Sequence, residues 1–137
     1  MITAQVTENL ISAETLTASV KSDTAGAVVT FSGDVRNHDK GKKVSTLNYE
    51  IHPSAQSVIE KITSEVVAKH DVVNVAVAHR YGEIPIGESA FVVAVAAAHR
   101  GPAFACCNEL VERVKAELPI WKYQEFADGS TEWVNSA

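Results

Sequence analysis

Apolar side chains recur at helical spacing in two long segments of the chain. The first segment follows Pro53 and Ser54, and the second follows Gly101 and Pro102 and stops at Pro119. Residues at this spacing lie along one face of an α-helix, so the pattern predicts two amphipathic helices. The apolar positions are Ala55, Val58, Ile59, Ile62 and Val66 in the first segment and Phe104, Cys107, Val111, Val114 and Leu118 in the second.

The other apolar residues follow the patterns of β-strands. Alternation marks a half-buried strand at 44–51, whereas the run from Ala90 to Ala98 is apolar throughout, as in a central strand covered on both faces. Ser12 predicts the N-cap of a short helix, and residues 127–130 predict the turn of a hairpin. We expect strands at residues 2–6, 27–35, 44–51, 72–80, 90–98, 120–126 and 131–134.

These elements combine into an α+β fold. We predict a single domain covering residues 1–137, with a mainly antiparallel sheet and the two main helices packed on it. A short N-terminal helix and a C-terminal hairpin complete the prediction. The chain length suits one domain with a substantial hydrophobic core.

Composition and charge narrow the possible functions. Of the 137 residues, 46% are hydrophobic and 21% are charged, and the net charge is −5. A chain with this balance lacks the basic surface that nucleic-acid binding needs. The longest apolar run is too short to span a bilayer, and residues 1–6 are too few and too polar for the apolar part of a signal peptide. We therefore expect a cytoplasmic protein that binds neither nucleic acid nor membrane.

The cysteines and histidines do not indicate a metal site. Cys106 and Cys107 are adjacent, which suits neither an ordinary disulfide nor the spaced ligands of a zinc site. The five histidines are scattered along the chain. We predict no metal, and we interpret both cysteines as packing residues of the core.

Two His-Arg pairs stand at the ends of predicted strands. His99 and Arg100 lie where a buried strand meets a helix, whose free N–H groups favour an anion. They are therefore a candidate anion site, but a strand end that simply meets solvent or a carboxylate also fits these residues. A tight hairpin places His79 and Arg80 about 26 Å from the first pair. We interpret Arg80 and Glu83 as supports of this hairpin turn.

Three further cations are candidates for chemistry. Lys115 lies one helical turn after Val111, beside the apolar stripe, where desolvation lowers the pKa of an amine. A neutral amine serves as a base or a nucleophile, although a surface lysine that lays its stem along apolar residues fits the same position. Lys122 follows Trp121 on a predicted strand, and its position alone does not show whether it is catalytic or an ordinary surface lysine. Arg36 precedes a polar loop and has the fork geometry that binds phosphate.

Taken in order along the chain, these segments resemble the large, catalytic subunit of molybdopterin synthase. The ordered set covers most of the chain and is far more specific than any one segment. The fold that the resemblance implies is an α/β-hammerhead. The matching segments are GAVVTFSGDVRN at 26–37, LNYE at 47–50, HRYGE at 79–83, GE at 87–88, AHR at 98–100, AF at 103–104, Lys115, and PIWK at 119–122.

The resemblance implies a sulfurtransferase of molybdenum cofactor biosynthesis. Members of this family convert cyclic pyranopterin monophosphate to molybdopterin by installing two sulfurs as a dithiolene. The sulfur arrives as a thiocarboxylate on the C-terminal glycine of a small ubiquitin-like subunit, whose tail enters a pocket of the large subunit. The implied assembly is a homodimer of large subunits within a heterotetramer, and no cofactor is implied.

The resemblance also assigns roles to residues. Lys115 and Lys122 match the catalytic lysines of the family and also contact the substrate. Because the substrate carries an anionic phosphate, cationic side chains are expected to bind it. The alternative is a non-catalytic module that docks a ubiquitin-like partner or a small anionic ligand; the presence of both lysines favours the enzyme. The implied substrate-binding residues are Asp34, Val35, Arg36, His99, Arg100, Lys115, Lys122, Tyr123 and Gln124.

Overall fold

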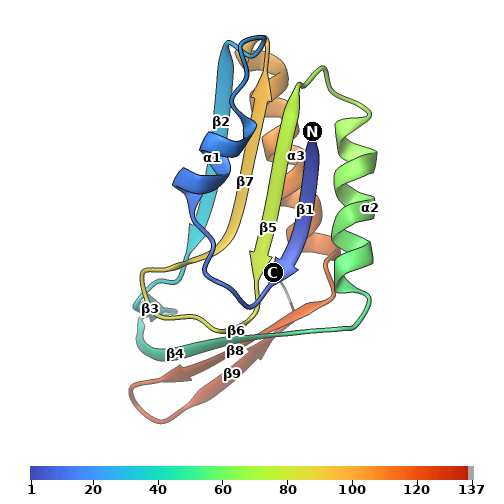
Figure 1. Cartoon of the computed structure of the whole chain (residues 1–137). Helices are drawn as coiled ribbons and strands as arrows, with labels where there is room; N and C mark the ends of the chain where they lie inside the picture. Colours follow the sequence, from blue (N-terminus) through green and yellow to red (C-terminus); the bar gives the residue numbers. More distant parts are fainter. Residues whose placement is uncertain (136–137) are drawn as a thin grey trace.

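The structure is a computed structural model that describes residues 1–135 of the chain (Figure 1). The predicted helices and strands are present, with ends that differ by one or two residues. The helices of this part of the chain are α1 (Ala13–Val20), α2 (Ala55–Val67) and α3 (Arg100–Glu117). The strands are β1 (Ile2–Thr7), β2 (Ala27–Asp34), β3 (His38–Asp39), β4 (Lys42–Ile51), β5 (Asn74–Arg80), β6 (Gly82–Glu83), β7 (Ser89–Ala97), β8 (Ile120–Phe126) and β9 (Thr131–Val134).

The α+β prediction is confirmed, but the strands divide between two sheets rather than one. The first sheet has the order β1-β5-β7-β2, in which only β1 and β5 are parallel. The second sheet has the order β3-β4-β8-β9, and β6 pairs with β4. Figure 1 shows the second sheet crossing beneath one end of the first. Alternation predicts that a segment is a strand but not which strand it pairs with, so the sequence did not reveal the division.

The core lies on both faces of the central strand β7, as its unbroken apolar run predicts. On one face, Val93 and Val95 belong to the cluster that packs against α2 and α3. On the other face, Ala94 and Ala96 pack with Val20 of α1. The three helices thus cover the two faces of the first sheet (Figure 1).

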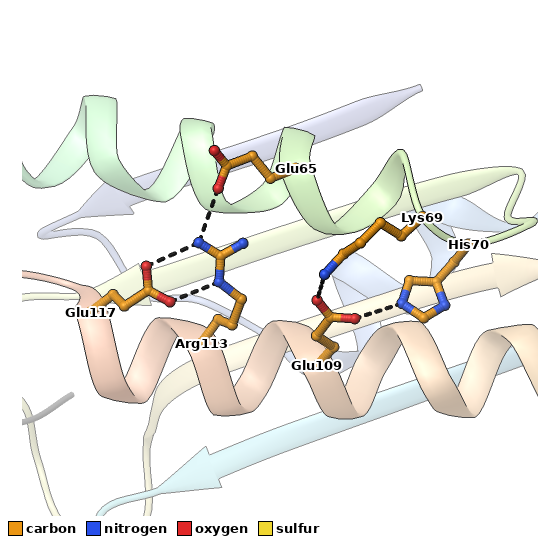
Figure 2. Close-up of polar contacts among 6 residues, drawn as sticks. All are labelled: Glu65, Lys69, His70, Glu109, Arg113 and Glu117. Atoms are coloured by element: carbon orange, nitrogen blue, oxygen red, sulfur yellow. Dashed lines mark hydrogen bonds and ion pairs between the residues drawn. The ribbon is translucent and has the colours of Figure 1, made fainter.

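Two separate groups of charged side chains join α3 to α2 and to the turn that follows α2 (Figure 2). Arg113 donates to Glu65 at 2.9 Å and to Glu117 at 2.7 Å, while Glu109 is bonded to Lys69 and to His70. Such partly exposed pairs contribute little stability individually. They link α3 to its neighbours on the side of α2, and the last turn of α3 lies at the end of this contact. The residues drawn in Figure 2 are Glu65, Lys69, His70, Glu109, Arg113 and Glu117.

The inner face of α3 confirms the interpretation of the cysteines. Cys106 and Cys107 are 0% and 4% exposed in the main core, and burial raises the pKa of each thiol to about 11. Both are therefore unreactive packing residues at neutral pH. Phe104 is 60% exposed, so the apolar stripe of this helix runs through Ala103 and Leu110 instead. No helix within residues 1–135 is long and apolar enough to cross a membrane.

Candidate active site

A cavity of about 200 Å³ lies where the two sheets and the last turn of α3 meet. We call it the lysine pocket. It brings together six of the predicted site residues with eight others. The lining residues are Gly33, Asp34, Val35, Arg36, His38, Asp39, Leu47, Tyr49, His79, Ala90, Phe91, Lys115, Lys122 and Gln124.

Strand pairing in the second sheet explains why Lys122 and Gln124 share this pocket. Lys122 pairs with Tyr49 and Gln124 pairs with Leu47, so these four side chains leave β8 and β4 on the same face. Tyr123 lies between the two on β8 and therefore points the other way. Its ring packs at a tilt against Trp133, with ring centroids 4.8 Å apart, in a separate hollow. Tyr123 therefore does not line the lysine pocket with Lys122 and Gln124, because side chains alternate along a strand.

Lys115 and Lys122 converge although seven residues and a proline separate them. Lys115 lies in the last turn of α3, and the chain then turns at Leu118 and Pro119 into β8. Lys115 keeps contact with solvent, yet surrounding protein desolvates it, and this desolvation together with the charge of Lys122 lowers the pKa of its amine. The two lysines are therefore close enough to influence each other across one cavity.

The end of β2 supplies the next part of the wall. The pairing of β2 with β7 shifts register at Gly33 and Asp34, which bends the strand end toward the pocket. Val35 is then held by its backbone, which donates to Glu88 and accepts from Gly87. The Asp34 carboxylate accepts hydrogen bonds from Ser32 and Ser89 at 2.6 and 2.7 Å, and these bonds lower its pKa.

Asp39 is a pocket residue that the sequence analysis missed. The polar residues 37–43 predict a loop, but β3 and β4 form a hairpin whose turn residues, Lys40 and Gly41, have φ of 52° and 76°. The hairpin places the Asp39 carboxylate 2.8 Å from the Gln124 amide and 3.4 Å from Arg36. The Gln124 hydrogen bond, followed by the charges of nearby cations, lowers the pKa of Asp39. A Lys-Gly turn between polar residues was the available signal.

His79 is a second residue that the sequence analysis placed elsewhere. It is 0% exposed, stacks on Phe91 at 5.3 Å and meets the edge of Tyr49 at 5.0 Å. Its Nδ1 lies 2.8 Å from the carbonyl oxygen of Arg80, which only accepts, so Nδ1 carries the proton. Burial lowers the pKa of His79 to about 4, and the charge of Lys115 acts in the same direction. The ring is therefore neutral at pH 7, and its Nε2 has no hydrogen-bond partner among residues 1–135.

The structure does not bring His99 and Arg100 to the lysine pocket. They lie at the first turn of α3, in a shallow hollow with Ala98 and Pro102. Fifteen residues of helix separate Arg100 from Lys115, a rise of about 22 Å. The lysine pocket of one chain therefore does not contain His99 or Arg100. The two His-Arg pairs lie apart, as predicted. The histidine that lines the lysine pocket is His79, not His99.

Arg80 supports the turn after β5, as predicted. Its guanidinium donates to Glu88 at 2.6 Å, across the segment that joins β5 to β7. Glu83 lies in the same segment, in β6, where it pairs with Asn48 of β4. The ion pair between Arg80 and Glu88 holds this segment in place. The backbone carbonyl of Glu88, in the same segment, accepts the hydrogen bond from Val35.

The lysine pocket is cationic within an acidic chain. Arg36, Lys115 and Lys122 carry positive charge, against the carboxylates of Asp34 and Asp39. Leu47, Tyr49 and Phe91 provide an apolar wall. Such a site suits an anion attached to a flat or apolar group. No group of three or more His, Cys, Asp or Glu side chains within residues 1–135 has the arrangement of a metal site.

Comparison with known proteins places the chain in a family. Residues 6–117 match the family described as MoaE protein. The chain belongs to this family. The resemblance found in the sequence is thereby confirmed.

Relatives in the MoaE family carry a shared description. The molybdopterin synthase catalytic subunit of Aspergillus niger is 41% identical over 117 residues, which are 85% of this chain and 65% of that protein. The molybdopterin synthase catalytic subunit of Thermoplasma volcanium is 35% identical over 130 residues, which are 94% of this chain and 95% of that protein. The chain thus spans about two thirds of the fungal relative and almost all of the archaeal one.

Solved structures support the MoaE family fold. A crystal structure of molybdopterin synthase from Staphylococcus aureus has a TM-score of 0.87 and 30% identity, and the match covers 96% of both chains. A structure described as the complex of subunits 1 and 2 of molybdopterin-converting factor from Helicobacter pylori has a TM-score of 0.73 at 22% identity, and this likeness concerns the fold alone.

Proposed function

We propose that this chain is the catalytic subunit of molybdopterin synthase. It transfers sulfur from the C-terminal thiocarboxylate of a small ubiquitin-like subunit to cyclic pyranopterin monophosphate, which forms the dithiolene of molybdopterin. The sulfur comes from the partner, so the reaction needs neither a cysteine nor a cofactor of this chain. We place the reaction in the cytoplasm, in a heterotetramer built on a homodimer of this chain.

The observation that carries the proposal is the convergence of Lys115 and Lys122 on one small cavity. A module that only docks a partner needs no pair of amines in a pocket. Two cations that repel each other are stabilised when an anion enters between them. A thiocarboxylate and a phosphate are both anions, so each step of the proposed reaction brings negative charge to this point.

The chain's own residues have distinct tasks in this reaction. The lowered pKa of Lys115 supports an amine that gives and takes a proton near the reacting sulfur. Lys122 and Arg36 stabilise the charge of the substrate phosphate, which increases if its ring opens to a terminal phosphate. Gln124 and Asp34 orient the groups at the mouth of the pocket. The thiocarboxylate sulfur forms a bond to a side-chain carbon of the pterin, and the oxygen displaced from that carbon leaves as water. A water molecule then attacks the tail carbonyl, the carbon–sulfur bond to the tail breaks, and the water oxygen completes the carboxylate that remains.

His99 and Arg100 keep their proposed role in substrate binding only if a second copy supplies them. The distance along α3 excludes a contact with the lysines of their own chain. Both side chains are exposed at a helix N-terminus, which favours an anion. In a two-fold homodimer whose interface includes both surfaces, His99 and Arg100 of each copy face the lysine pocket of the other copy, and the contact occurs twice. We therefore propose a site shared between two copies.

Mixing inactive variants tests the shared site. In a homodimer of Lys115→Ala and Arg100→Ala chains, one site carries both changes and the other carries neither. Random reassortment then restores about a quarter of the wild-type turnover, because half of the dimers are mixed and each has one intact site. No recovery beyond the two separate variants, with reassortment verified, would exclude sharing.

Reconstitution tests the proposed function itself. The chain is mixed with its thiocarboxylated small subunit and cyclic pyranopterin monophosphate, and dithiolene product is measured. Lys115→Ala is expected to abolish turnover while it still binds the small subunit. Lys61→Ala, on the exposed face of α2, is the matched control and retains turnover. Binding of the small subunit without product from the wild-type chain would instead support a non-catalytic docking module.

A further inference from the structure

We propose that His79 is a specificity residue of the lysine pocket, whose Nε2 accepts a hydrogen bond from the last backbone amide of the partner's C-terminal tail. This inference rests on the proposed function, because it takes the tail as the ligand. It adds a residue and a chemical contact to that function.

The first support is the fixed orientation of the ring. The Nδ1–H group donates to the carbonyl of Arg80, and Phe91 and Tyr49 hold the ring from two sides. The ring cannot turn to use Nε2 elsewhere without breaking that hydrogen bond. A fully buried acceptor without a partner is unfavourable, and native proteins rarely keep one without a reason. A ligand that donates a hydrogen bond at this point satisfies the acceptor.

The second support is the chemistry that His79 accepts and rejects. A neutral imidazole with its lone pair directed at the ligand attracts an N–H group and repels an anionic oxygen. Lys115 lines the same cavity and does the opposite, since it attracts the anion. The last residue of a peptide presents both groups side by side, an amide N–H next to a terminal carboxylate or thiocarboxylate. A phosphate presents only acceptors and does not match this pair.

The third support is size. A cavity of about 200 Å³ is smaller than the usual range of pockets that enclose a drug-sized ligand. Gly33 and Ala90 keep part of the wall close to the backbone of β2 and β7. A narrow tail that ends in glycine fits this space, and the bulkier pterin is left at the mouth, near Arg36.

The test removes one N–H group from the tail. The small subunit is prepared by semisynthesis with an ester in place of the last amide, which deletes the donor and keeps the shape. A second subunit carries the ester one residue earlier, which leaves the last N–H in place and is the matched control. Binding and single-turnover sulfur transfer are measured with the wild-type chain and with His79→Phe, whose ring keeps the stacking but has no acceptor.

The wild-type chain is expected to bind the terminal ester about tenfold more weakly than the amide. The control ester should lose much less affinity than the terminal ester does. His79→Phe should bind amide and terminal ester equally, which a merely structural role of His79 does not predict. If His79→Phe does not fold, the ratio in the wild-type chain alone decides. Equal binding of amide and terminal ester to the wild-type chain, with normal sulfur transfer, overturns this inference and leaves the proposed function intact. Failure of the unmodified subunit to bind or transfer sulfur overturns both.

Discussion

The buried imidazole of His79 should make the fold sensitive to mild acid. In the folded chain its pKa is lowered from 6.5 to about 4, first by burial. In the unfolded chain the ring is exposed and takes a proton as the pH falls below about 6.5. Above pH 6.5, protonation of His79 therefore does not lower the free energy of unfolding. This free energy falls progressively as the pH falls from 6.5 to 4, and below pH 4 His79 causes no further change.

The size of the effect follows from the gap of about 2.5 between the two pKa values. At 1.36 kcal/mol for each pKa unit, the total loss is about 3 kcal/mol, of which about 2.5 kcal/mol falls between pH 7.5 and 4.5. This is a large part of the stability of an ordinary domain. The perturbation that isolates it is His79→Gln, which does not titrate in this range.

Urea unfolding at one protein concentration measures the effect. The free energy of unfolding is determined for wild type and His79→Gln at several values between pH 7.5 and 4.5. The variant is less stable at pH 7.5, because it loses the ring packing on Phe91 and Tyr49. The difference should shrink by about 2.5 kcal/mol as the pH falls. A difference that stays constant over this range would refute the assignment of His79 as a buried neutral ring.

Two further predictions concern the charges of the lysine pocket. Lys122→Met should raise the pKa of Lys115 toward 10.5, because it removes the positive charge of Lys122 that helps to lower this pKa. An NMR titration of the isotope-labelled Lys115 amine measures the change. An unchanged pKa would contradict the coupling between the two lysines. Asp39→Asn should tighten the binding of inorganic pyrophosphate several-fold at low salt and less at high salt, because it removes a carboxylate that competes for Arg36 and Gln124. Calorimetry measures this affinity, and weaker binding would mean that Asp39 is needed to hold Arg36 in place.

The elements of the fold were predictable because they depend on local patterns. The apolar run of β7 required burial on both faces, and the structure provides α1 on one and α2 with α3 on the other. The division into two sheets was not predictable, since it depends on pairing between β4 and β8, which lie far apart in the sequence. Long-range pairing leaves little trace in a single sequence.

The candidate site was predictable only in part, for similar reasons. The motifs identified Lys115 and Lys122, but only the turn after α3 brings them together. Alternation along β8 already directs the Tyr123 side chain away from those of Lys122 and Gln124. Each of His79 and His99 precedes an arginine near a strand end, so this motif alone does not show which of them lies near the lysines. Which histidine lines the lysine pocket depends on burial and on which strand lies opposite, and both follow from the folded structure.

The most direct test of the central claim counts sulfur atoms. The wild-type chain is incubated with excess cyclic pyranopterin monophosphate and a limited amount of thiocarboxylated small subunit, and mass spectrometry follows the tail while the dithiolene is quantified. The account predicts that two thiocarboxylates become carboxylates for each dithiolene formed, and that Lys115→Ala converts neither. Loss of thiocarboxylate without dithiolene, or equal turnover by Lys115→Ala, would contradict the claim that the lysine pocket transfers sulfur.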